Sequence, residues 1–158
     1  MRIGIGYDIH ALKRGRPLIL GGVTIPYEKG LVGHSDGDAL WHAVIDAVLG
    51  AMAEGDIGEL FPDTDPRHKG ASGAEFAREI VRRLKRRRLR VAHVDAVVVA
   101  QAPKLGPYKR RMRERLAKGL GLPVSRVNVK AKTNEGFGEV GKKKAIACHA
   151  VVALTPSR

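Results

Sequence analysis

The stretch over residues 33–50, GHSDGDALWHAVIDAVLG, constrains this chain most, because within a few residues it passes from a polar loop into a helix. Asp38 is predicted to cap that helix, since its carboxylate can accept from the free N–H groups of the first turn. Gly50 is expected to end the helix or to allow close packing. The predicted apolar face consists of Leu40, Val44, Ala47 and Val48. A helix that only fills a core would not need the polar residues of this stretch, which are His34, Ser35, Asp36, Asp38, His42 and Asp46.

The length of 158 residues predicts a single domain, 1–158, that can bury a hydrophobic core. Nothing approaches the roughly 18 unbroken apolar residues of a membrane span. The N-terminal sequence MRIGIGYDIH lacks the basic-then-apolar order of a signal peptide, so we expect a cytoplasmic protein with no membrane partner. The one cysteine, Cys148, excludes an internal disulfide, and its apolar neighbours indicate a buried thiol rather than a nucleophile.

The formal net charge of +13 suggests either a nucleic-acid partner or a phosphorylated small substrate. The densest basic run covers residues 82–90, and a nucleic-acid surface would interleave such a run with aromatic residues for base stacking. Aromatic residues form only 4% of the chain, and none falls in this run. We therefore interpret the run as a solvated helix face, which makes a nucleic-acid partner the rival hypothesis.

Residues 2–10 alternate as a strand, with Asp8 and His10 on one face and the apolar Ile3, Ile5 and Tyr7 on the other. Residues 53–75 are rich in turn formers, and their embedded apolar residues predict an anchored loop. The other expected elements are a hairpin over 17–26, a loop over 27–37, a helix from 72 or 73 to 87, a strand over 91–102, a helix over 107–120, and strands over 124–132 and 143–154. This order predicts an α+β fold, a single mixed β-sheet with helices packed on one face.

Asp8, His10 and His42 form the first candidate site, with two ligands from one strand face and one from a helix. Two imidazoles and a carboxylate suit zinc and leave a fourth position for substrate or water. Asp46, four residues after His42, is expected to orient that imidazole. On spacing alone, a surface carboxylate with two hydrogen-bonded histidines remains the alternative.

Two further segments carry polar groups at strand or loop ends. The loop carboxylates Asp56, Asp63 and Asp65 suit hydroxyl recognition or metal positioning, although such residues commonly cap turns. Residues 130–141, KAKTNEGFGEVG, combine Thr133 with glycines and lysines that could hold phosphate oxygens, although an ordinary turn is the alternative. Residues 100–106, AQAPKLG, could form a ligand rim.

Together these segments resemble the 2-C-methyl-D-erythritol 2,4-cyclodiphosphate synthase family of non-mevalonate isoprenoid biosynthesis. The resemblance rests on RIGIGYDIHAL at 2–12, residues 21–51, GDIGELFPDTDP at 55–66, QAPKLGPY at 101–108, and residues 129–151. It implies a homotrimer with active sites between subunits. It also implies a cyclase, in which the 2-phosphate of 4-diphosphocytidyl-2-C-methyl-D-erythritol 2-phosphate attacks the β-phosphorus and CMP leaves.

The resemblance also implies the roles of individual residues. Asp8, His10 and His42 would bind zinc, and Glu135 a second divalent cation, magnesium or manganese. His34 and Thr133 are the implied catalytic residues, and residues 100–106 the implied cytosine pocket. The implied substrate-binding residues are Asp8, His10, His34, Ser35, Asp56, Ile57, Gly58, Phe61, Pro62, Asp63, Thr64, Asp65, Ala100, Gln101, Ala102, Pro103, Lys104, Leu105, Gly106, Lys132, Thr133, Asn134, Glu135, Glu139 and Lys142.

Four positions depart from the family pattern. Threonines are common where this chain has Lys132 and Asn134, which bears on the phosphate contacts. Glu139 and Lys142 stand where the family usually has an aromatic residue and an arginine. In some members these last two positions line a trimer-axis cavity that binds an isoprenoid diphosphate, and their replacement here argues against that secondary ligand.

Overall fold

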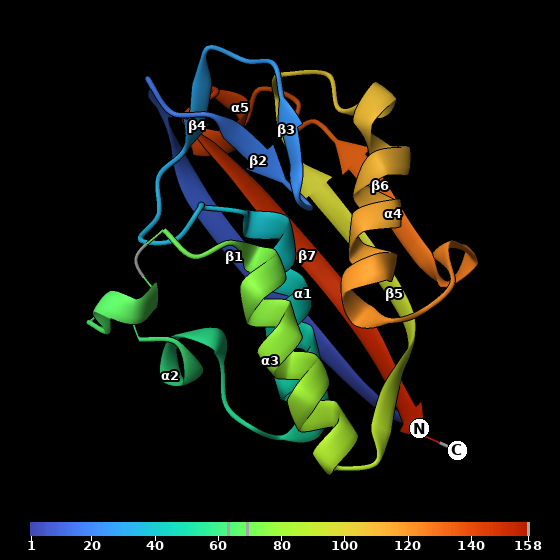
Figure 1. Cartoon of the computed structure of the whole chain (residues 1–158). Coiled ribbons are helices and arrows are strands. Elements are labelled where there is room, and N and C mark those ends of the chain that lie inside the picture. The colour runs from blue at the N-terminus through green and yellow to red at the C-terminus, as the bar shows by residue number, and fades with distance from the viewer. Residues whose placement is uncertain (63, 69, 158) are drawn as a thin grey trace.

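The computed structural model describes residues 1–62, 64–68 and 70–157, and within these residues five strands form a mixed sheet in the order β4-β1-β7-β5-β6 (Figure 1). Neighbouring strands are antiparallel except β5 and β6, which are parallel. The strands of this sheet are β1 (Arg2–Arg14), β4 (Lys29–Leu31), β5 (Leu89–Val99), β6 (Val127–Lys132) and β7 (Ala145–Pro156). The predicted α+β class with a mixed sheet is confirmed.

The predicted hairpin does form, but it lies outside the main sheet. The strands β2 (Leu18–Leu20) and β3 (Val23–Ile25) pair only with each other in the described part of the chain, so the expectation of a single sheet was wrong. The turn between them contains Gly21 and Gly22, both at positive φ, a conformation that glycine adopts without steric cost. The N–H groups of these glycines donate to the Asp38 carboxylate, at 2.8 and 2.6 Å. These bonds hold the hairpin on the start of α1 (Ala39–Met52) rather than on the sheet edge.

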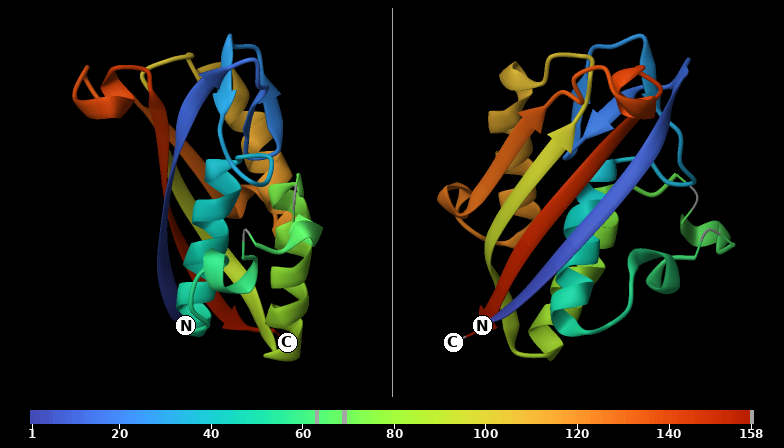
Figure 2. Two further views of the ribbon diagram at one scale, coloured as in Figure 1. Left: turned by 90° about the vertical axis from the view of Figure 1, so that its left-hand side faces the viewer. Right: turned by 180° about the vertical axis from the view of Figure 1, so that it is seen from behind.

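The three longer helices, α1, α3 (Gly73–Arg86) and α4 (Lys109–Leu120), lie on one face of the sheet, as predicted (Figure 2). Short helical segments complete the chain: α2 (Ile57–Leu60), α5 (Gly138–Gly141), and the 3₁₀ turns η1 (Pro66–His68), η2 (Gly106–Tyr108) and η3 (Val124–Arg126). No helix in the described ranges is long and apolar enough to cross a membrane.

The helix α1 begins as predicted, because Asp38 accepts a hydrogen bond from the Trp41 N–H at 3.1 Å. It is buried on nearly all sides, since β1 and β7 contact one side and α3 the other, so its apolar surface exceeds the predicted stripe. Gly50 neither ends the helix nor packs closely: Ala53, in the left-handed region, is the C-cap, and a Cβ added at Gly50 would lie 3.7 Å from its nearest neighbour.

Close packing occurs instead at Gly4 and Gly6 of β1. A Cβ added at Gly4 would lie 2.0 Å from the Ala47 carbonyl oxygen, and one at Gly6 would lie 1.9 Å from that of Ala43. The backbone of α1 therefore rests directly on β1, which a side chain at either glycine would prevent. This contact fixes the distance between the helix and the strand that together carry the candidate site.

The remaining differences are at element ends and in loops. The strand predicted over 91–102 is β5 and ends at Val99, and the helix predicted over 107–120 begins as the turn η2. β4 lies in the segment predicted as a loop over 27–37, and α2 lies in the irregular segment 53–75. The embedded residues Ile57, Leu60 and Phe61 pack against the core, as expected. Cys148 is fully buried, and burial raises the pKa of its thiol, in agreement with an inert small side chain.

The basic run over 82–90 is partly ion-paired. Glu54, after the end of α1, lies 3.4 Å from Arg83 and 2.6 Å from Arg87, and Glu79 pairs with Arg82 within α3. These pairs connect the end of α3 to the end of α1. Arg82 and Arg87 remain exposed beside their partners, which agrees with the predicted solvated helix face, although the run continues past α3 into β5.

The sheet face opposite the long helices carries exposed apolar side chains. Ile3 is 63% exposed and Ile5 72%, and Tyr7 and Ile9 continue the row along β1. Val151 of the neighbouring β7 belongs to the same group. A contiguous apolar strand face of this kind is typical of a surface that another protein chain covers.

Candidate functional site

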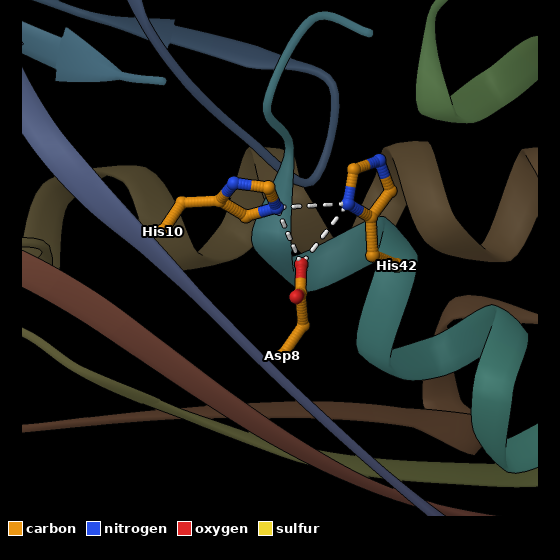
Figure 3. Close-up of side chains that lie close together, drawn as sticks. All are labelled: Asp8, His10 and His42. Carbon is orange, nitrogen blue, oxygen red and sulfur yellow. Dashed lines mark hydrogen bonds and ion pairs between the residues drawn. The ribbon is translucent and has the colours of Figure 1, made fainter. Parts of the chain in front are cut away.

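Asp8, His10 and His42 converge on one point (Figure 3). Asp8 Oδ2 lies 2.8 Å from His10 Nε2 and 3.0 Å from His42 Nδ1, and the two nitrogens are 3.2 Å apart. Asp8 and His10 share a face of β1 because they are two residues apart, and α1 brings His42 to them. The three residues predicted from the sequence therefore form one cluster.

The other nitrogen of each imidazole has a partner of its own. His10 Nδ1 donates to the backbone carbonyl of Val32, which leaves Nε2 as the acceptor nitrogen. His42 Nε2 lies 3.1 Å from Ser35 Oγ, so a proton on Nε2 would leave the Nδ1 lone pair directed at Asp8 and His10. These outer partners suit two neutral histidines whose lone pairs face a common point, the arrangement typical of metal ligands.

Asp46 does not orient His42, and that prediction was wrong. Asp46 Oδ1 accepts a hydrogen bond from the Ile57 N–H at 2.7 Å, so it supports the start of α2. Both nitrogens of His42 are already engaged, Nδ1 with Asp8 and Nε2 with Ser35. The orienting group is therefore the Ser35 hydroxyl, which comes from the loop before the helix.

The electrostatics of the cluster favour a carboxylate anion. Burial alone would raise the pKa of Asp8, but hydrogen bonds that His10 and His42 donate when their facing nitrogens are protonated outweigh it and lower that pKa to about 2, and a bound cation would take the place of those protons. The hydrogen bond to Asp8 raises the pKa of His10. Asp8 is therefore ionised at neutral pH and provides the negative charge that a cation would need.

The donor set fits a tetrahedral metal ion. Ligand atoms about 2.0–2.1 Å from a tetrahedral zinc ion lie about 3.3 Å from one another. The observed separations of 2.8, 3.0 and 3.2 Å come close to that spacing. Asp8, His10 and His42 can thus bind one ion through three ligands and leave a fourth position open.

A pocket of about 260 Å³ adjoins the cluster. Besides the three residues of the cluster, its walls include five more residues predicted to bind substrate, which are His34, Ser35, Ile57, Gly58 and Phe61. His68 and Phe76 also line it, and both were missed as site residues. The Phe61 ring stacks on Phe76 with centroids 4.4 Å apart, and His68 lies edge-on to both rings. Phe76 is a buried core residue of α3, and its stack on Phe61 also makes it part of the pocket wall.

The acidic loop has local roles in this structure. Asp56 caps α2 by accepting from the Glu59 N–H at 2.8 Å. Asp65 pairs with Arg67, and hydrogen bonds from the Arg67 side chain lower the pKa of Asp65 to about 2. Asp56, Asp65 and the exposed Pro62 and Thr64 do not line the described pocket. Asp63, also predicted to bind substrate, lies outside the described residues.

Eight of the remaining predicted residues line a second depression, of about 340 Å³, at the ends of β5 and β6, whereas Ala102, Asn134 and Glu135 do not line it. It shares no lining residue with the first pocket in the described ranges. Thr133 Oγ1 donates to Glu135 Oε1 at 2.6 Å, and the Gly136 N–H donates to Gln101 Oε1 at 3.2 Å. The predicted residues lining this depression are Ala100, Gln101, Pro103, Lys104, Leu105, Gly106, Lys132 and Thr133. One chain therefore presents two separate groups of predicted residues.

The other predicted residues near α5 contact one another or the local backbone. Glu139 lies 3.7 Å from the Lys142 ammonium and 3.1 Å from that of Lys144. Asn134 Nδ2 donates to the Phe137 carbonyl at 2.8 Å. Glu139 and Lys142 are both exposed, and neither lines either pocket.

Comparison with known proteins identifies the family of this chain. The model of the YgbB family matches residues 1–155. The 2-C-methyl-D-erythritol 2,4-cyclodiphosphate synthase of Paraburkholderia phytofirmans is 57% identical, with 97% of this chain and 96% of the relative covered. A solved synthase structure of that name, in a CDP-bound form, aligns with a TM-score of 0.90 and 42% identity, over 98% of this chain and 100% of the other.

A second solved structure is the bifunctional IspDF from Campylobacter jejuni, with a TM-score of 0.94 and 41% identity. The alignment covers 98% of this chain but only 42% of that protein, so the similarity concerns one part of it. Given the match over residues 1–155 and the similarity to curated synthases over nearly their whole length, the chain belongs to the YgbB family of 2-C-methyl-D-erythritol 2,4-cyclodiphosphate synthases.

Proposed function

We propose that this chain converts 4-diphosphocytidyl-2-C-methyl-D-erythritol 2-phosphate to 2-C-methyl-D-erythritol 2,4-cyclodiphosphate and CMP, as a metal-dependent phosphorus–oxygen lyase of non-mevalonate isoprenoid biosynthesis. Residues 1–158 act as one catalytic domain. The observation that carries the proposal is the convergence of Asp8, His10 and His42 beside a pocket in a member of this synthase family. A similar solved synthase is described in a form bound to CDP, which supports a cytidine nucleotide as ligand.

The metal requirement follows from the donor set. Asp8, His10 and His42 would bind zinc, because two imidazoles and a carboxylate at tetrahedral spacing are typical zinc ligands. Glu135 would bind the second cation, magnesium or manganese, through oxygen. Bound cations would neutralise the negative charge that opposes the approach of one phosphate to another.

The chain's own residues bind and position the substrate. His34 and Ser35 line the pocket at the cluster and can donate hydrogen bonds to phosphate oxygens. The Thr133 hydroxyl can do the same from the second depression. No general base is needed, since a phosphate dianion is already a nucleophile. Alignment of the two reacting groups lowers the activation free energy, by on the order of 7–11 kcal/mol in well-oriented systems.

A homotrimer would complete the site. The metal cluster and the proposed cytosine pocket, residues 100–106, lie in separate depressions of one chain, so a single substrate would reach both where two subunits meet. The exposed apolar row of β1, with Ile5 72% exposed, is the surface available for such an interface. This arrangement explains why one protomer holds two half-sites.

The test is a CMP-release assay with the diphosphocytidyl substrate. Turnover should stop when a chelator removes the metals and return when zinc and magnesium are added back. Absence of CMP release from the metal-replete protein would contradict the proposal. A steep, salt-dependent affinity for DNA or RNA in a protein without cyclase activity would instead support the nucleic-acid alternative.

A further inference from the structure

The Ser35 hydroxyl orients His42, but the contact that Ser35 makes within its own loop is weak. Its Oγ lies 3.1 Å from His42 Nε2. The same oxygen accepts from the Gly37 N–H at 3.4 Å, which is longer than the usual range of about 2.7–3.2 Å for such a bond. Helix α1 begins after this residue, so the hydrogen bonds of the helix do not fix it. The contacts that keep Ser35 against His42 must therefore come from its neighbours in the loop.

Both neighbours of Ser35 bond to the segment that leads into α3. On one side the His34 carbonyl accepts from the Gly70 N–H, and on the other the Asp36 N–H donates to the Ala71 carbonyl, each at 3.1 Å. These two bonds fix the backbone immediately before and after Ser35. The position of the serine is thus tied to a part of the chain that is distant in sequence.

The carboxylate of Asp36 bridges the starts of two helices. Its Oδ1 accepts from the Asp38 N–H at 3.0 Å, at the N-cap of α1, and its Oδ2 accepts from the Gly73 N–H at 3.1 Å, in the first turn of α3. The two helices run side by side and begin at the same end of the fold (Figure 1). The first N–H groups of a helix have no partner within it and lie at the positive end of its dipole, so one carboxylate stabilises both starts. Asp36 therefore connects the loop that carries Ser35 to α3.

Asp36 does not itself line the pocket at the metal cluster. The residues that it connects do: Ser35 lies on one wall, and Phe76, three residues after Gly73 in α3, lies on another. The bond between Asp36 and Gly73 thus sets the separation of two pocket walls. Its effect on the site must be exerted through the residues that it holds in place.

We propose that Asp36 is a positioning residue for the metal site, which holds Ser35 against His42 by binding the start of α3. The proposal rests on the proposed function, because it takes the cluster of Asp8, His10 and His42 as the zinc site. It adds that zinc affinity depends on a residue that neither binds the metal nor lines the pocket. A carboxylate suits this role, because each of its oxygens accepts one N–H and the side chain cannot turn without breaking both bonds.

Zinc affinity, measured by competition with a chelator of known affinity, tests the proposal without the cyclase reaction. Asp36→Asn keeps the size of the side chain but provides one acceptor oxygen instead of two, and its NH₂ group then faces an N–H of one helix. We expect zinc affinity to fall about tenfold, the lower end of the effect of removing a residue that orients a ligand. Unchanged zinc affinity in the folded variant would overturn the proposal.

Asp36→Ser is a second variant, which serves alone if Asp36→Asn does not fold. A serine hydroxyl can keep the local bond to the Asp38 N–H, but it is too short to reach Gly73. The start of α1 is therefore retained while the bridge to α3 is lost. The fall in zinc affinity should equal that of Asp36→Asn, and an affinity equal to that of the wild type would show that the bridge has no part in metal binding.

A double-mutant cycle shows whether Asp36 acts through Ser35. In a Ser35→Ala background the hydroxyl that Asp36 would position is absent, so adding Asp36→Asn should lower zinc affinity by less than about twofold. The same loss in both backgrounds would mean that the substitution loosens the site in general. That result would also overturn the proposal.

Ser72→Ala is the matched control at the same helix start. Ser72 Oγ caps α3 by accepting from the Glu75 N–H, so its removal weakens the start of α3 while the bond between Asp36 and Gly73 remains. The unfolding temperature should fall, with no change in zinc affinity. A loss of affinity equal to that of Asp36→Asn would show that any weakening of α3 is sufficient, against the proposal. A wild type that binds no zinc would instead contradict the proposed metal site, so the two failures are distinguished.

Discussion

Ser35 Oγ lies 3.1 Å from Nε2 of His42, and this contact decides which imidazole nitrogen faces the candidate metal site. With Nε2 directed at the serine, Nδ1 faces Asp8 and His10. The backbone carbonyl of Val32 accepts from Nδ1 of His10 in the same way, which leaves Nε2 facing Asp8 and His42. The loop before α1 therefore orients a ligand as well as lining the pocket.

Ser35→Ala should weaken metal binding about 10- to 100-fold, the usual effect of removing a residue that orients a ligand. The ligands themselves remain, so the protein should still fold and bind metal at high concentration. Competition with a chelator of known affinity measures the change. Ser125→Ala, at an exposed position in η3, is the control. Equal metal affinities in the Ser35→Ala variant and the wild type would contradict the assignment.

His42→Ala and Asp46→Ala should separate ligand binding from loop support. His42→Ala removes a proposed ligand, so we expect loss of both bound zinc and CMP release. Asp46→Ala removes only the acceptor for the Ile57 N–H, so zinc should be retained while KM rises as α2 loosens. Mass spectrometry measures the zinc content of each variant, and steady-state kinetics measure KM and the rate of CMP release. Loss of zinc from the Asp46→Ala variant would restore the original prediction that Asp46 supports His42.

The contrast between Asp38 and Asp46 shows how far the sequence predicts this fold. Asp38 directly precedes an apolar helical repeat, so its capping role follows from local backbone geometry. Asp46 bonds to Ile57, eleven residues away, at the start of a short helix that Asp56 also caps. The same limit explains the missed Phe76 and His68, whose roles depend on contacts with Phe61 rather than on spacing. Alternation along β1 placed Asp8 and His10 together because a strand fixes side-chain direction at every residue.

Gly6→Ala should destabilise the protein by about 3 kcal/mol, at the upper end of overpacking costs, because its Cβ would meet backbone atoms. The added carbon would lie 1.9 Å from the Ala43 carbonyl oxygen, and the helix carrying His42 would have to move. Gly50→Ala is the control: its Cβ has room, and replacing a glycine within a helix should stabilise by about 0.5–1 kcal/mol. Urea denaturation of both variants measures these changes. Equal stability of the two variants would show that α1 does not rest on β1 as described.

Ile5→Lys should disrupt the proposed trimer, because it places a charge in the middle of the exposed apolar row of β1. Burying one isoleucine is worth about 1.5–3 kcal/mol, and a buried unpaired ammonium adds a further cost. Light scattering after size-exclusion chromatography should give a smaller particle than the wild type, with little CMP release. Val124→Lys, at another exposed apolar position, should leave the particle size unchanged. An Ile5→Lys variant of unchanged size would show that this face is not the interface.

Mixed oligomers of two inactive variants test directly whether subunits share active sites. His42→Ala disables the metal half-site, and Thr133→Ala impairs the second depression, which shares no lining residue with the first in the described part of the chain. If each site joins the metal half of one subunit to the Thr133 half of its neighbour, a trimer that contains both variants keeps one intact site, about a third of its sites. Co-expression with two affinity tags and sequential purification gives the mixed species, which should regain about that share of wild-type CMP release. If the mixed species is no more active than the two variants measured separately, both residues belong to a site within one subunit. The two depressions of one chain would then have to move together to contact the same substrate.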